Sequence, residues 1–164
     1  MAKYYGKNIV GELPLSDAQT LPDSTDDDST NMVYVGNPTN GQLWINVYAN
    51  TAITIATGAV FNIELESYSD GDTPASAIAP FTKDNAHGEI ANGDGTAETD
   101  AHIYLLHKTS ADTELAFSAG DLITQCAIPE DMLNAIGHTY VQLKYETDAD
   151  ESSEKVDAFV WVKA

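Results

Sequence analysis

Strict alternation of apolar and polar residues is the feature that most constrains the fold of this chain. In VFNIELESY (60–68), Phe61, Ile63 and Leu65 alternate with polar residues, and YVQLKYE (140–146) repeats the pattern. Because successive side chains of a strand point to opposite faces, this period of two indicates a sheet with one buried and one solvated face. Such one-sided burial is typical of antiparallel sheets.

Patterns with the period of a helix are nearly absent from the sequence. One short helix is predicted over PEDMLNAIG (129–137), because Pro129 suits a first helical turn and Gly137 can close the last one. The long segment 69–101 is rich in Asp, Gly, Ala and Thr and is predicted to be an extended loop. Eight strands are predicted near residues 31–36, 42–49, 52–57, 59–68, 102–108, 121–128, 138–146 and 156–163.

These elements predict an all-β fold, a jelly-roll-type β-sandwich of about eight antiparallel strands with one short helix. A chain of 164 residues that is 43% hydrophobic can bury one substantial core. An immunoglobulin-like sandwich is the second choice, because its usual cysteine pair is missing. The single cysteine, Cys126, excludes an internal disulfide, and its apolar neighbours predict that it packs as a small hydrophobe.

The charge balance argues against two classes of partner. The chain carries 26 acidic residues against 7 basic ones, a formal net charge of -19, and all seven basic residues are lysines. Nucleic-acid binders present basic faces and favour arginine, so we expect no contact with nucleic acid or an anionic membrane. No apolar stretch reaches the roughly 20 residues that span a bilayer. The first 15 residues lack the apolar centre of a signal peptide, which predicts synthesis in a cytoplasm without export by that route.

No pattern of catalytic or metal-binding residues emerges from the sequence. His102 and His107 are five positions apart on a predicted strand, which places them on opposite faces. The acidic stretch NGDGTAETD (92–100) lacks the central glycine and the closing glutamate of an EF-hand loop. Nucleophile-elbow, Walker and dinucleotide-binding motifs are also missing. We therefore expect no enzyme activity, no cofactor and no metal.

Two predicted strands carry aromatic residues on the face that should point away from the core. In QLWINVYA (42–49) and KVDAFVWVKA (155–164), the positions between the aliphatic residues hold Trp44, Tyr48, Phe159 and Trp161. Either other parts of the same chain cover these rings, or they form an interface with a partner.

The N-terminal residues form a polar, acidic stretch. LPLSDAQTLPDSTDDDST (13–30) has too few apolar groups to offset its ordering entropy alone. The chain is therefore divided into an extended N-terminal arm, 1–30, and a single β-sandwich domain, 31–164. We expect the arm to be ordered by lying across a neighbouring polypeptide.

Both ends of the chain resemble a family of tailed-phage capsid cement, or decoration, proteins with a jelly-roll fold. Members begin with a Ser-x-x-Gln element, then a polar stretch, then Ser-Thr-Asn before the first strand; the matching residues are Ser16, Gln19, Ser29, Thr30 and Asn31. GHTYVQLKYETDAD…KVDAFVWV (137–162) resembles the closing hairpin of the family, and IPEDMLNAIG resembles the lead-in to it.

The resemblance implies a structural virion protein that binds the outer capsid surface and links neighbouring capsomers. Its implied partners are the major capsid protein and further copies of the same chain. The implied partner-contacting residues are Trp44, Tyr48, Phe159 and Trp161, with Ser16 and Gln19 from the arm. The alternative is a jelly-roll carbohydrate-binding module for host attachment, in which the four aromatic rings stack on sugars.

Overall fold

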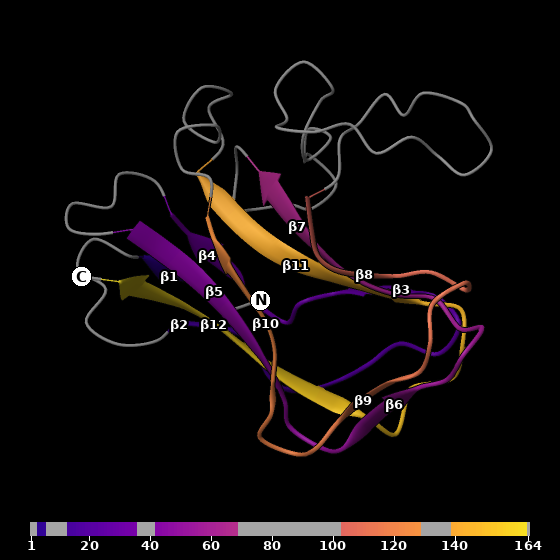
Figure 1. The fold of residues 1–164 in the computed structure, drawn as a ribbon. Helices are drawn as coiled ribbons and strands as arrows, with labels where there is room; N and C mark the ends of the chain where they lie inside the picture. Colours follow the sequence, from indigo (N-terminus) through magenta and orange to yellow (C-terminus); the bar gives the residue numbers. More distant parts are fainter. Residues whose placement is uncertain (1–2, 6–12, 36–41, 69–102, 129–138, 164) are drawn as a thin grey trace.

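A computed structural model describes residues 3–5, 13–35, 42–68, 103–128 and 139–163 (Figure 1). This part of the chain consists of β-strands, turns and loops, and it contains no helix long and apolar enough to cross a membrane. The predicted helix at 129–137 and the predicted loop at 69–101 lie outside the described residues, as does His102.

The strands form two main sheets. The first, here called the β7–β11 sheet, has the order β4 (Met32–Tyr34), β11 (Tyr140–Thr147), β7 (Phe61–Tyr68) and β8 (Ile103–Lys108), with β1 (Lys3–Tyr5) beside β4 and β3 (Asp26–Asp28) beside β11. The second, the β5–β12 sheet, has the order β10 (Leu122–Ala127), β5 (Gln42–Ala49), β12 (Lys155–Lys163) and β2 (Leu13–Thr20). A separate pair joins β6 (Ile53–Ile55) to β9 (Leu115–Phe117). All these pairings are antiparallel except that of β1 with β4.

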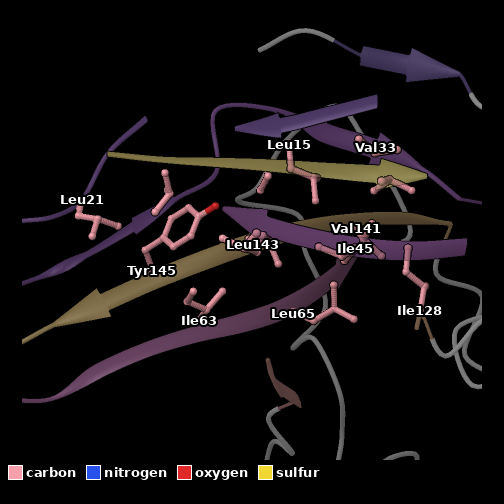
Figure 2. Packing of buried hydrophobic residues seen from close by; sticks show 14 of the residues in the cluster. Leu15, Leu21, Val33, Ile45, Ile63, Leu65, Ile128, Val141, Leu143 and Tyr145 are labelled. Carbon is pink, nitrogen blue, oxygen red and sulfur yellow. The ribbon is translucent and has the colours of Figure 1, made fainter. Parts of the chain in front are cut away.

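The two sheets pack face to face around one apolar core. The β7–β11 sheet contributes Phe61, Ile63, Leu65, Val141, Leu143 and Tyr145, and the β5–β12 sheet contributes Leu43, Ile45, Val47, Val156, Ala158 and Val160. Each of these side chains is fully buried, and Figure 2 shows Ile63, Leu143 and Tyr145 facing the strands that carry Leu15 and Ile45. The apolar side of the predicted alternation is therefore confirmed in both sheets, and the all-β, sandwich-like architecture follows from it. The expectation of a solvated opposite side is wrong for the β7–β11 sheet, where Asn62, Glu64 and Gln142 are buried as well.

Each of the eight predicted strands corresponds to an observed one, but the structure adds others. The pattern around 52–57 gives only the short strand β6, which pairs with β9 outside the two main sheets. Strands β1, β2, β3 and β9 were not predicted. Three of these have only three residues, too few to show a period, and β2 contains a proline and several polar residues.

Residues 13–30 take their burial from their own chain, which corrects our expectation of a foreign surface. Strand β2 pairs along β12 and β3 pairs with β11. Leu15 and Leu21 are fully buried in the common core. The physical reason is that backbone hydrogen bonds to an existing sheet edge, together with these two leucines, can order a segment that is otherwise polar.

Candidate partner interface

The outer face of the β5–β12 sheet brings the four predicted aromatic residues together. Trp161 on β12 lies directly opposite Trp44 on β5, and the next outward row pairs Phe159 with Asn46. A third row pairs Asp157 with Tyr48. Directly opposed residues of an antiparallel pair project to the same side, and the residues between these positions point into the core. We call Trp44, Asn46, Tyr48, Phe159 and Trp161 the aromatic face.

The aromatic face is partly accessible. Its four rings are half-buried, and the ring centroids of Trp44 and Trp161 lie 6.4 Å apart with an interplanar angle of 36°. Neighbouring strands widen the face, because Pro14 on β2 lies beside Phe159 and Ala127 on β10 lies beside Trp44. Several apolar side chains thus adjoin on one side of the sheet.

Asn46 holds the centre of this face in place. Its Oδ1 accepts hydrogen bonds from Trp161 Nε1 at 2.9 Å and from Gln125 Nε2 at 2.8 Å. Its Nδ2 donates to the Tyr48 hydroxyl at 3.0 Å. One buried amide therefore orients three neighbouring side chains, which reduces the ordering cost of binding a partner. Our sequence reasoning missed Asn46, although WINVY places it between Trp44 and Tyr48 on the same side of the strand.

One end of the face is acidic and supports a bend in β2. Asp157 Oδ1 accepts a hydrogen bond from the backbone N–H of Ala18 at 2.6 Å, and its Oδ2 accepts one from Asn50 Nδ2 at 2.9 Å. Ala18 has a φ of 46°, in the left-handed region that costs energy for residues other than glycine. The carboxylate of Asp157 offsets part of that cost and holds β2 against β12.

The structure buries Ser16 fully and leaves Gln19 half-buried, and both side chains are hydrogen-bonded within the chain. Ser16 is fully buried, and its hydroxyl hydrogen-bonds Gln19 Oε1 at 2.7 Å and the Tyr145 hydroxyl at 2.9 Å. Gln19 Oε1 also accepts from the Thr30 backbone N–H at 2.8 Å, while Gln19 Nε2 donates to the Asp28 carbonyl at 2.7 Å. These bonds tie β2 to β3, so in the folded chain Ser16 has no surface to offer a partner.

Ser29 continues this network onto β11. Its backbone N–H donates to the Leu143 carbonyl at 2.6 Å, and its hydroxyl accepts from the Leu143 N–H at 3.0 Å and donates to the Asn31 carbonyl at 2.9 Å. Its own carbonyl accepts from Gln142 Nε2 at 3.0 Å. The residues on which the family resemblance rests therefore share one hydrogen-bonded region that fixes residues 13–31 onto the sandwich.

The titratable groups that the sequence singled out lie in ordinary surroundings. Burial raises the pKa of the Cys126 thiol, which donates to the Ala127 carbonyl, and this disfavours the reactive thiolate. His107 Nδ1 lies 2.8 Å from Asn62 Oδ1, and its ring packs against Tyr104. Among the described residues, no group of three or more His, Cys, Asp or Glu side chains is arranged to hold a metal ion.

Comparison of the chain with protein-family models, with curated proteins and with solved structures found no match. The family resemblance of the two chain ends therefore rests on the sequence alone.

Proposed function

We propose that the chain is a jelly roll, and the order of its strands supports this. Apart from the three-residue strands β1 and β3, the two main sheets contain eight strands. The first of these pairs with the last, β2 with β12, and the second with the seventh, β4 with β11. The third pairs with the sixth, β5 with β10, and the fourth with the fifth, β7 with β8. This nesting is expected when one long hairpin of strands rolls up into two sheets, as in the jelly rolls of viral capsid and lectin domains.

On this scaffold we propose a structural role as a capsid cement protein of a tailed phage. The aromatic face is the observation that carries the proposal. Trp and Tyr are enriched among the residues that dominate protein–protein binding energy, and Asn46 already holds Trp161 and Tyr48 in place. In the proposed assembly this face contacts the major capsid protein on the outside of the shell, and copies of the chain link neighbouring capsomers.

Two further features fit this role: the negative net charge of the chain, and the many identical binding sites that a capsid would offer it. A net charge of -19 disfavours like-charged and nucleic-acid partners and favours a neutral or basic protein surface. An icosahedral shell offers many identical sites, so a modest interface gains avidity when copies of the chain associate with one another. Homo-oligomers on the capsid exterior are therefore part of the proposal.

The experiment is co-sedimentation of the purified chain with empty heads of the same phage, comparing Trp161→Ala with Tyr104→Ala. Both rings are half-buried, but Tyr104 pairs with Glu64 on the outer face of the other sheet. Trp161→Ala is expected to weaken head binding more than tenfold, about 1.4 kcal/mol, and Tyr104→Ala to leave it unchanged. Thermal melting of both variants checks that they are folded. A wild-type chain that fails to bind heads would refute the cement role, and equal losses in both variants would refute the assigned face.

A carbohydrate-binding role is the second candidate, because polar groups border the rings. Gln125, which is exposed, and the Tyr48 hydroxyl are both hydrogen-bonded to Asn46 at the edge of the face. Sugar sites combine apolar surfaces with a few oriented polar groups of this kind. Saturable binding on a glycan array that is lost in Trp161→Ala, together with no head binding, would favour this role in host attachment over the cement role.

A further inference from the structure

The turn between β11 and β12 meets the N-terminal segment at three backbone hydrogen bonds. The Leu21 N–H donates to the Glu154 carbonyl at 2.9 Å, and the Ser24 N–H donates to the Ala149 carbonyl at 2.9 Å. In the opposite direction, the Glu151 N–H donates to the Pro22 carbonyl at 3.3 Å. We call this contact between residues 21–24 and residues 149–154 the turn junction.

Two glutamates lie close together in the turn junction. Glu151 is only 7% exposed, and the hydrogen bond from the Glu154 N–H to the Glu151 carbonyl at 2.9 Å closes a turn that brings the two residues together. Glu154 Oε1 accepts a hydrogen bond from the Thr54 N–H of β6 at 3.0 Å. Its other oxygen, Oε2, is buried, and within the described part of the chain no donor reaches it.

A proton carried by Glu151 could fill the open position at Glu154 Oε2. An ionised carboxylate only accepts hydrogen bonds, so two ionised carboxylates side by side can only repel each other. A protonated Glu151 would instead donate its O–H to Glu154 and satisfy the buried oxygen. Leaving such an atom unsatisfied is costly, whereas this proton removes both the repulsion and the missing bond.

We infer that Glu151 keeps its proton in the folded chain and donates it to Glu154, and that losing this proton loosens the turn junction. The pair would then act as a pH-sensitive latch between the N-terminal segment and the β11–β12 turn. This inference concerns the fold and does not depend on the proposed capsid role.

The charges around the pair favour the proton on Glu151. Burial is the main cause that raises the pKa of Glu151, to about 7, followed by the hydrogen bond and charge of Glu154 and then by the charge of Asp150. Asp23 of the N-terminal segment faces Asp150 across an isolated bridge and adds a further carboxylate. The nearest cation in sequence, Lys155, follows Glu154, and its backbone N–H donates to Thr51 Oγ1.

The sign of the effect on stability follows from linkage. The pKa of Glu151 in the folded chain, about 7, lies above its usual value of 4.5, so the folded chain binds more protons than the unfolded chain between these values. The stabilisation is fully present below about pH 4.5. It is lost as the pH rises toward and through about 7.

The test is a melting series from about pH 5 to about pH 8.5 on the wild-type chain, Glu151→Gln and the control Glu114→Gln. The amide of Glu151→Gln can donate to Glu154 Oε2 but does not titrate. We expect its Tm to exceed the wild-type Tm by several degrees at the alkaline end, with the difference shrinking toward the acidic end. Glu114 is exposed, so Glu114→Gln should follow the wild-type curve.

Carboxyl ¹³C NMR of the wild-type chain keeps the test independent of how the variant folds. The signal that disappears in Glu151→Gln identifies Glu151, and it should titrate close to neutral pH. Should Glu151→Gln fail to fold, the wild-type titration alone decides whether any glutamate titrates there. Parallel melting curves, or glutamate signals that all titrate below about pH 5, would overturn the inference. A Tm of the wild-type chain that rises with added Ca²⁺ alone, and no longer does so in Glu151→Gln, would assign the site to a cation instead.

Discussion

The side chains on the outer faces of the two sheets differ in how they are stabilised. On the β7–β11 sheet, Asn62 Nδ2 donates to Glu146 Oε2 at 3.0 Å, and Lys144 Nζ lies 3.2 Å from Asp26 Oδ2. On the β5–β12 sheet, the corresponding positions hold mostly aromatic rings around Asn46. The first face forms polar contacts within the chain, whereas the second presents apolar area that only further burial can stabilise. This difference is why we assign partner binding to the aromatic face.

Lys144 shows how the polar face balances its charges. Burial lowers the pKa of Lys144, but the hydrogen bond and charge of Asp26, with the charges of Glu66 and Glu64, outweigh this and raise it. The opposite effect is seen at Asp28, where burial raises the pKa and the Lys144 charge only partly offsets it. The charge of Lys144 thus offsets part of the negative charge of several carboxylates on this face. The face therefore does not need a basic partner to balance these carboxylates.

The largest effect is expected from deleting residues 1–30, which removes the strands that border both faces. Leu15 and Leu21 are fully buried, and β12 would lose its pairing with β2. We expect residues 31–164 alone to show no cooperative thermal unfolding by circular dichroism. If they melt cooperatively near the wild-type Tm, the segment is a dispensable arm after all, and the aromatic face does not depend on β2.

A smaller, more selective effect is expected from replacing either of two buried asparagines, one on the outer face of each main sheet. Asn46 is 8% exposed on the aromatic face and Asn62 is 5% exposed on the polar face, and each hydrogen-bonds neighbouring side chains. Replacing either with alanine should cost about 1–3 kcal/mol in urea unfolding, because buried partners are left unsatisfied. Only Asn46→Ala should also weaken head binding, because it releases Trp161 and Tyr48.

Co-sedimentation under conditions where both asparagine variants are folded separates stability from binding. Equal binding by the two variants would remove the distinction between the faces. Loss of binding in Asn62→Ala alone would move the interface to the polar face.

The sequence predicted what depends on local pattern and missed what depends on pairing across the chain. The strands β7 and β11 can be predicted from the sequence, because each buries its apolar side in the core and so shows a period of two. Strand β2 cannot be predicted in this way, because its polar residues form a strand only by pairing with the edge of β12. Ser16 was expected at an interface because of the family resemblance, but its side chain is buried and hydrogen-bonded to Gln19 and Tyr145, a pairing across the chain that no local pattern contains.

The aromatic face itself was predicted only in part. Period two placed Trp44 and Trp161 away from the core, but their position opposite each other depends on the register of β5 with β12, which no local pattern contains. The role of Asn46 as the shared hydrogen-bond partner depends on that register too. The composition of the site was therefore predictable, and its geometry was not.

The smallest effect is expected at the ion pair of the polar face. Lys144 and Asp26 are 28% and 54% exposed, and pairs in such surroundings contribute about 0–1 kcal/mol because water and salt screen them. Lys144→Gln should lower the free energy of unfolding by no more than that, and added salt should shrink the difference. Asp26→Asn is the matched control and should behave alike. A loss several times larger in Lys144→Gln alone would show that the lysine compensates the whole acidic group around it, and the polar face would then depend on one cation as the aromatic face depends on one amide.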